Sequence, residues 1–363
     1  MISGVNMMKK LTALLLCLTL LCPTALAGQW YSFSGTVPDD LGFIVNGYSG
    51  SVTVTFLGDC TLGGEEGKQG SFAGLISRKG YGYPFQHLLK LTAADDLTVA
   101  NLEGVLSDRT LTRVSKTFNF KGPTAYTGIL LEGSVECVTL ANNHTNDYGS
   151  AGQRDTKAAL EAAGIAYFST DSVAIWEEHG LMIGFVGAFY SLNGSRLTEY
   201  KKQIALLKEA GCAAIITVMH AGQEHTGETT HAQRDIARKA AAQGSCLVVG
   251  HHPHVVQGYQ LVSGIPVAYS LGNCVFGGNS HPDDTDALAL QVVLTFEEGE
   301  LVSQELHFYP IAFSGTSSGN DYSPVLLTGT RAARVLKKMK DSTGYEMPEM
   351  TEEGSVIRVD MTE

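Results

Sequence analysis

Short hydrophobic runs, many of them β-branched, recur along the chain, and each is followed by polar or glycine-rich positions. The clearest are 51–59 (SVTVTFLGD), 95–104 (DDLTVANLEG), 135–144 (VECVTLANNH), 180–190 (GLMIGFVGAFY), 212–222 (CAAIITVMHAG), 245–252 (SCLVVGHH) and 264–273 (GIPVAYSLGN). Runs of this length bounded by turn residues are typical of buried β-strands. Residues 286–311 instead form two alternating runs joined by Glu-Glu-Gly-Glu, which predicts a β-hairpin.

Helical patterns lie between these strands. The segments 150–164, 196–211 and 229–244 each end at a glycine, a common helix stop. A further helix is predicted over 331–344, followed by a short strand in SVIRVDM. Strands that alternate with helices predict an α/β fold. We expect a layered α/β sandwich with two mixed β-sheets flanked by helices.

The N-terminus has the pattern of a signal peptide over residues 1–27. Lys9 and Lys10 precede an apolar run of about eleven residues, too short for a spanning helix. Ala25 and Ala27 fit the small-residue pattern before a cleavage point. The protein is therefore expected to be secreted or to lie on the extracellular face of the cell envelope, with an uncleaved membrane anchor as the alternative. Residues 28–50 are aromatic and glycine-rich without a period, and are predicted to be an N-terminal extension.

Composition narrows the class of protein. The chain has 363 residues, of which 44% are hydrophobic, enough for one large α/β domain or two smaller ones. Its net charge of −12 argues against nucleic acid as a partner, which would require a basic patch. The five cysteines beyond the signal peptide show no C-x-x-C spacing and are interpreted as small core residues.

Five of the predicted strands end in side chains that could bind a metal ion. They are Asp59, Glu103, the pair Asn143 and His144, His220, and the histidines His251, His252 and His254 of GHHPH. Side chains at the carboxyl ends of strands can point into one crevice outside the sheet. Carboxylates, an amide oxygen and imidazoles together suit Mn, Fe or Zn, whereas an all-oxygen set would suit Mg or Ca. Each residue alone could be a cap, a turn or a solvated side chain, but their coincidence favours one or two divalent metal ions.

The order of these motifs resembles the metallophosphoesterase superfamily, and more closely its CapA branch, the poly-γ-glutamate capsule-synthesis proteins. The matching segments are FLGD (56–59), VANLEG (99–104), VTLANNHTNDYG (138–149), MHAGQEH (219–225), GHHPHVVQG (250–258) and AYSLGNCVFGG (268–278). The resemblance implies a CapA-like metallophosphoesterase domain over 51–315, completed by the helix and strand of 316–363.

The resemblance also implies roles for individual residues. Asp59 and His254 would bind a first metal ion and Glu103 would bridge two. The second ion would be bound by Asn143, His220 and His252. His144 would be the catalytic residue, as a general acid or as a donor to the transition-state oxyanion. The residues expected to support these ligands or to contact substrate are His251, Glu224, Asn142 and Asn273.

One motif departs from the superfamily. Its first block, Asp-x-His, is here Asp59-Cys60-Thr61, so the histidine that would complete the first site is missing. The implied function is synthesis of poly-γ-glutamate or a related capsule polymer, with a phosphoesterase-like hydrolase site. The alternatives are an extracellular phosphoesterase that acts on small or polymeric phosphoesters, and a non-catalytic scaffold that binds polymer.

The expected partners are an anionic cell-surface polymer or a phosphoester, together with membrane-bound capsule-synthesis machinery. An acidic chain would repel a polyanion unless metal ions or a local basic group received it. The candidates for that group are Arg109, Arg113, Lys116 and Lys121, and the alternative is an ordinary solvated loop.

Overall fold

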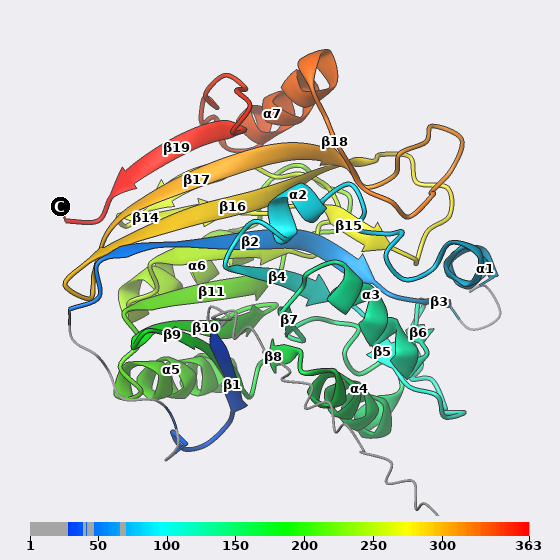
Figure 1. Ribbon diagram of the computed structural model, residues 1–363, viewed down its shortest axis with the longest axis horizontal. Helices are drawn as coiled ribbons and strands as arrows, with labels where there is room; N and C mark the ends of the chain where they lie inside the picture. The colour runs from blue at the N-terminus through cyan, green and yellow to red at the C-terminus, as the bar shows by residue number, and fades with distance from the viewer. Residues whose placement is uncertain (1–27, 39–40, 42–46, 66–69, 363) are drawn as a thin grey trace, which may run out of the picture.

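Two large mixed β-sheets pack face to face, with helices on their outer faces (Figure 1). The computed structural model describes residues 28–38, 41, 47–65 and 70–362. This arrangement confirms the predicted layered α/β sandwich. The signal peptide predicted over residues 1–27 lies outside the described residues.

The larger sheet has nine strands, in the order β18-β17-β16-β2-β4-β7-β8, with β15 beside β2 and β19 beside β17. Its parallel strands are β2 (Gly50–Thr61), β4 (Leu97–Leu102), β7 (Cys137–Thr139), β8 (Ala166–Phe168) and β15 (Asn273–Phe276). The predicted hairpin forms β16 (Asp286–Glu297) and β17 (Glu300–Ala312), and β18 (Val325–Leu326) and β19 (Ser355–Asp360) pair antiparallel with β17.

The second sheet has seven strands, in the order β1-β9-β10-β11-β12-β14-β13. They are β1 (Gln29–Phe33), β9 (Val173–Glu178), β10 (Leu181–Phe189), β11 (Ala214–His220), β12 (Leu247–His251), β13 (Tyr259–Val262) and β14 (Ile265–Ala268). A small third sheet holds β3 (Gly64–Glu65), β5 (Val105–Leu106) and β6 (Phe120–Gly122). Residues Gln29–Phe33, which we expected in an extension without periodicity, instead pair with β9 as an edge strand.

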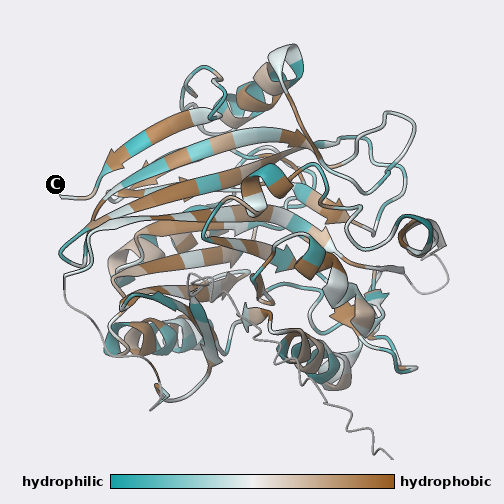
Figure 2. Ribbon diagram, viewed as in Figure 1, coloured by the Kyte–Doolittle hydropathy of each residue, from teal (hydrophilic) through white to brown (hydrophobic). Residues whose placement is uncertain are grey.

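The hydrophobic core has three layers, and Figure 2 shows hydrophobic residues concentrated on the strands. The middle layer lies between the two sheets and includes Phe56 of β2 and Phe185 of β10. Outside the nine-stranded sheet pack α1 (Gly70–Lys79), α3 (Thr127–Glu132) and α4 (Gly149–Ala163), with the short α2 (Leu89–Thr92) and a 3-10 turn (Thr124–Tyr126) nearby.

Helices α5 (Gly194–Glu209) and α6 (His231–Gln243) pack on the outer face of the seven-stranded sheet. Helix α7 (Gly329–Thr343) contacts β13 of one sheet and β17 of the other, so it closes an edge of the sandwich. Among the described residues, no helix combines the length and apolar character needed to span a membrane.

Candidate metal centre

The carboxyl ends of β2, β4, β11 and β12, with the loop after β7, meet at one end of the sandwich. In register, Asp59 pairs with Asn101 of β4 and with Asn273 of β15, and His220 pairs with His251. The eleven residues predicted from the sequence, from Asp59 to Asn273, therefore lie in or around one cluster, which we call the centre.

A local irregularity of β2 directs Asp59 into the centre. Leu57 and Cys60 both face the outer core layer, although they lie three positions apart, because the pairing of β2 with β4 shifts between Leu57 and Asp59. This β-bulge breaks the alternation of the strand, so Asp59 turns toward the other sheet. Gly58 permits it: a Cβ there would lie 2.2 Å from the carbonyl oxygen of Gly272.

Asp59 is fully buried and is surrounded by donors. Its Oδ1 accepts a hydrogen bond from Nδ2 of Asn101 at 2.7 Å and lies 3.3 Å from Nδ1 of His251. Its Oδ2 lies 3.2 Å from Nδ1 of His254 and accepts the backbone N–H of His252 at 3.3 Å. Burial alone would raise the pKa of Asp59, but His251 and His254 outweigh it and hold the pKa well below its usual range.

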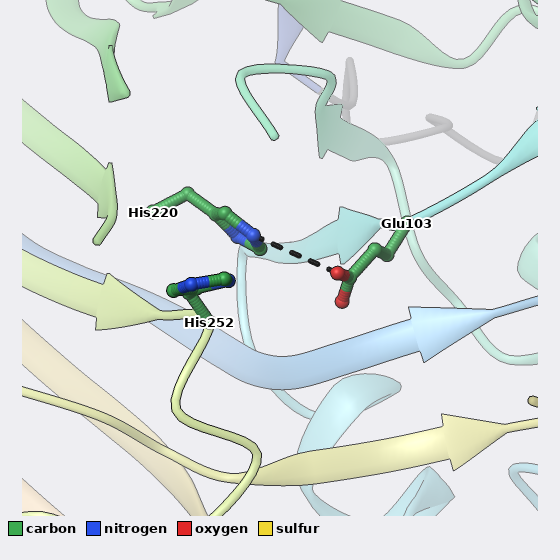
Figure 3. Close-up of side chains that lie close together, drawn as sticks. All are labelled: Glu103, His220 and His252. Atoms are coloured by element: carbon green, nitrogen blue, oxygen red, sulfur yellow. Dashed lines mark ion pairs between the residues drawn. The ribbon is translucent and has the colours of Figure 1, made fainter. Parts of the chain in front are cut away.

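Glu103 is also fully buried, but neither of its carboxylate oxygens has a hydrogen-bond partner among the described residues. Its Oε1 faces three imidazole nitrogens: Nε2 of His220 at 3.6 Å, of His144 at 3.8 Å and of His254 at 3.9 Å. Figure 3 shows Glu103 and His220 pointing toward each other, with the ring of His252 beside them. Burial, followed by repulsion from Asp59, raises the pKa of Glu103 well above its usual value.

His220, Asn143 and His252 lie together beside Glu103. The Nε2 of His220 lies 2.7 Å from the side-chain oxygen of Asn143, and the rings of His220 and His252 are 4.7 Å apart. Burial lowers the pKa of His220 well below its usual value, and it also lowers that of His252, with repulsion from His254 as the next cause. Imidazoles held neutral in this way are suited to metal coordination.

The histidine turn after β12 has an unusual backbone. His252 has φ +98° and His254 has φ +59°, a region that residues other than glycine rarely adopt. Nδ1 of His254 lies 2.9 Å from Oδ1 of Asn273, which orients the ring. Burial opposes protonation of His254, but Glu103 and Asp59 prevail and raise its pKa to about 10. Strained residues of this kind are concentrated at functional sites.

His144 is held by a buried carboxylate that the sequence analysis did not single out. Nδ1 of His144 lies 2.7 Å from Oδ2 of Asp147, and Lys116 contacts Oδ1 of the same carboxylate at 2.5 Å. The ring packs against Phe120, with centroids 4.4 Å apart. Burial lowers the pKa of His144, while the contact with Asp147 acts in the opposite direction. Nε2 is thereby left facing Glu103.

Asn101 is a second residue that sequence reasoning missed. Its Nδ2 donates to Asp59 and lies 3.3 Å from Nδ1 of His220, and its Oδ1 accepts from Asn142 at 2.9 Å. Asn142 also accepts the backbone N–H of His144 at 3.0 Å. Its place in the VANLEG segment, on the strand that leads to Glu103, was the available signal.

A pocket of about 400 Å³ opens onto the centre. Its wall combines His144, His254, Asn273 and Glu224 with the aromatic rings Phe118, Phe120 and Phe276. Three of the four cations expected to form a basic group contact other groups of the protein. Lys116 contacts Asp147, Arg109 pairs with Asp155, and Lys121 donates to the carbonyl oxygen of Arg109 at 2.7 Å.

The donor set fits divalent metal ions. Among the described residues, three groups place ligand atoms within 4.8 Å of one another. They are Glu103–His220–His252, Asp59–Glu103–His254 and Glu224–His252–His254. Glu103 is common to the first two, as expected for a residue between two ions. Thr61, which stands where a histidine was expected, is buried, and its hydroxyl has no partner among the described residues.

Fold and centre together define a class: a layered α/β sandwich with a candidate dinuclear metal centre at its strand ends. Comparison with known families is consistent with this class. The profile of the bacterial capsule synthesis protein family PGA_cap matches residues 53–278, more than half of the chain, and the chain belongs to this family. The resemblance to CapA-type capsule-synthesis proteins is thereby confirmed.

Two curated relatives are similar to this chain. The PGA biosynthesis protein CapA of Bacillus subtilis (strain 168) is 28% identical over 255 residues, which cover 64% of this chain and 65% of the relative. The capsule biosynthesis protein CapA of Bacillus anthracis is 24% identical over 251 residues, which cover 62% of this chain and 60% of the relative. The chain thus spans less than two thirds of the length of either relative.

Proposed function

We propose that this protein is an exported CapA-type protein that serves the biosynthesis of poly-γ-glutamate or a related capsule polymer, with a metal-dependent, phosphoesterase-like hydrolase site at the centre. Family membership and the names of the two relatives support the capsule role. Membrane-bound capsule-synthesis machinery is the proposed protein partner, and the outer face of the cell envelope the proposed location.

One observation carries the hydrolase part of the proposal. The carboxylate of Glu103 is fully buried without a hydrogen-bond partner, and three imidazole nitrogens surround it at 3.6 to 3.9 Å. An unpaired buried charge is strongly unfavourable, and these separations are too long for hydrogen bonds. The separations of Glu103 from His220 and from His254 match the spacing of ligands around a shared ion, since each ligand atom lies about 2.0–2.2 Å from a metal such as zinc. Metal ions between these residues would stabilise the carboxylate.

The metal-binding side chains of the centre would serve two ions. Asp59 and His254 would hold one ion, Asn143, His220 and His252 the other, and Glu103 would hold both. Bound divalent ions would polarise a phosphoester and offset charge on its attacking and leaving oxygens. The hydrogen bonds of Asn101 with Asp59 and with Asn142 connect the end of β2 to the loop after β7, so the ligands on these two segments keep their relative positions.

His144 would serve proton transfer. Asp147 accepts from Nδ1, so Nε2 is left facing Glu103, and His144 lines the pocket. Although burial lowers the pKa of His144, the negative charge of a bound phosphoester would favour its protonated form, in which Nε2 donates to the leaving oxygen. Lys116 fixes Asp147, which in turn fixes the tautomer and the orientation of the ring.

A second candidate function is hydrolysis of a small phosphoester at the same site. The observation that favours it is that Arg109, Lys116 and Lys121, three of the four cations expected to receive a long polyanion, each contact another group of the protein. The aromatic wall of the pocket would instead suit a compact substrate with an apolar part.

The test begins with metal content. Wild-type protein reconstituted separately with Mn²⁺, Fe²⁺ or Zn²⁺ should retain one or two equivalents after dialysis, measured by elemental analysis. Glu103→Gln keeps the shape but loses the charge and should retain markedly less, whereas Glu132→Gln, at an exposed position on α3, should match wild type. Wild type that retains none of the three metals would contradict the metal-dependent site.

A substrate panel then separates the functions. Loaded protein is assayed on phosphomonoesters, phosphodiesters and poly-γ-glutamate. Turnover of the polymer or of a polymer-linked phosphoester supports the first candidate, and turnover of small phosphoesters alone supports the second. Metal binding without turnover of any of them would leave a scaffold that binds polymer.

A further inference from the structure

We infer that Glu224 is a metal ligand of the centre, which completes from the solvent side the coordination of the ion held by His254. This inference rests on the proposed metal centre and adds a ligand that the strand-end pattern does not contain. The observation behind it is that the carboxylate of Glu224, on the loop after β11, lies close to His252 and His254 of the histidine turn.

The carboxylate of Glu224 lies where a ligand could bind. One of its oxygens and one nitrogen each of His252 and His254 lie within 4.8 Å of one another. Among the residues that the structure describes, Glu224 makes no hydrogen bond or ion pair, although it lines the same pocket as His144. Nδ1 of His252 is buried and also lacks a hydrogen-bond partner among these residues. A carboxylate without a described partner thus lies within ligand-sharing distance of two imidazoles.

The loop that carries Glu224 is tied to the histidine turn by its backbone. The N–H of Ala221 donates to the carbonyl of His251 at 3.1 Å, and the N–H of His225 donates to that of Pro253 at 2.8 Å. Nε2 of Gln257 donates to the carbonyl oxygens of Thr226 and Glu228, both at 2.9 Å. These bonds on both sides of Glu224 hold its backbone in place, so that binding an ion would order only the side chain.

The ion at His254 would have too few side-chain ligands without Glu224. Without Glu224, the ion at His254 would have three side-chain ligands, since the group that contains both strand-end carboxylates is Asp59–Glu103–His254. Divalent transition metals and zinc take four or more ligands, and Thr61 offers only a neutral buried hydroxyl. A third carboxylate would also bring the ligand charge to −3 against +4 from two divalent ions, which lowers the repulsion between the ions.

The position of Glu224 predicts which ion depends on it. Asp59, Glu103 and His220 are buried, whereas Glu224 is exposed. The ion at His254 would therefore have its outermost ligand in water and would exchange more readily than the ion at His220. Loss of Glu224 should weaken the first ion and spare the second.

The experiment compares Glu224→Gln and Glu224→Ala with Glu228→Gln, which removes the same charge from the same loop. Binding of Mn²⁺ and of Zn²⁺ is measured by titration calorimetry, with stoichiometry from elemental analysis and folding checked by circular dichroism of the metal-free proteins. Both Glu224 variants should lose at least about tenfold in affinity for one equivalent, while Glu228→Gln binds as wild type does.

Three outcomes would overturn the inference. Glu224 variants that bind with wild-type stoichiometry and affinity would assign the carboxylate to another task, such as recognition of a cationic group on a substrate, and leave the proposed centre intact. An equal loss in Glu228→Gln would show an effect of net charge alone. Wild type that binds neither metal would remove this inference together with the proposed centre, so the two failures are distinguishable.

Discussion

Asn101 and Asp147 show how single residues organise the candidate centre without being ligands. Asn101 joins Asp59 to Asn142, and thus connects the loop after β7 to the end of β2. Asp147 lies within the same short segment as His144 and holds its ring. Both are buried and hydrogen-bonded, so removing either would leave a polar partner unsatisfied in the interior.

The two histidines His144 and His220 are expected to respond differently to truncation. His144→Ala should retain wild-type metal content but lose about 10²- to 10⁴-fold in kcat, the usual contribution of a positioned acid. His220→Ala should lose metal and melt at a lower temperature in the presence of the ion, because a bound ion stabilises only the folded state. Elemental analysis, thermal melts and turnover of the best substrate found measure these effects. If both variants kept full metal content and turnover, the histidines would have a structural role.

At the scale of elements, the centre depends on how strands end rather than on any loop alone. The bulge in β2 turns Asp59 inward, and the parallel pairing of β11 with β12 sets His220 beside His251. Helix α7 contributes no residue to the centre and instead closes one edge of the sandwich, where it contacts β13 and β17. Its Arg334 and Lys338 both bind the carboxylate of Asp286 at the start of β16.

Asp286→Ala should loosen that attachment. Asp286 is buried, and although burial would raise its pKa, Arg334 and Lys338 hold the pKa below its usual value. Loss of these charge-assisted bonds should lower the free energy of unfolding by about 1–3 kcal/mol, measured by urea denaturation, with no change in metal content. Lys337→Ala is the control, because among the described residues Lys337 forms an ion pair only with Asp341, within α7. Equal effects of the two substitutions would contradict the role of the Asp286 cluster.

At the scale of the whole molecule, the sandwich begins directly after the predicted cleavage point. Strand β1 starts at Gln29, two residues beyond Ala27, and pairs along its length with β9. Removal of residues 1–27 would thus leave the described sheet intact.

Export should therefore yield protein whose N-terminus is Gly28. N-terminal sequencing of protein from the medium or the cell surface tests this directly. Protein that is membrane-associated and begins at Met1 would support the uncleaved anchor instead.

Most of the strands and helices, and most of the side chains that lie at the centre, could be predicted from the sequence alone. Alternating and continuous hydrophobic runs predicted β2, β4, β7, β10, β11, β12 and the β16–β17 hairpin, because burial imposes a period on each strand. Glycines that follow the helical patterns predicted where α4, α5 and α6 end. Ligand-type residues at five strand ends predicted the cluster, since parallel strands direct their carboxyl ends to one edge.

Tertiary structure decided what depends on pairing between distant segments. Edge strand β1 has too short a pattern to stand out, and only its register with β9 defines it. The inward turn of Asp59 requires the bulge opposite β4 and the close approach of Gly272, neither of which a strand's own period encodes. The bonds of Asn101, the engagement of Lys116 and Arg109, and the place of Glu224 over the histidine turn likewise arise from contacts across the fold. Side-chain partners in a packed interior are set by which backbones lie adjacent, and a local sequence pattern does not contain that information.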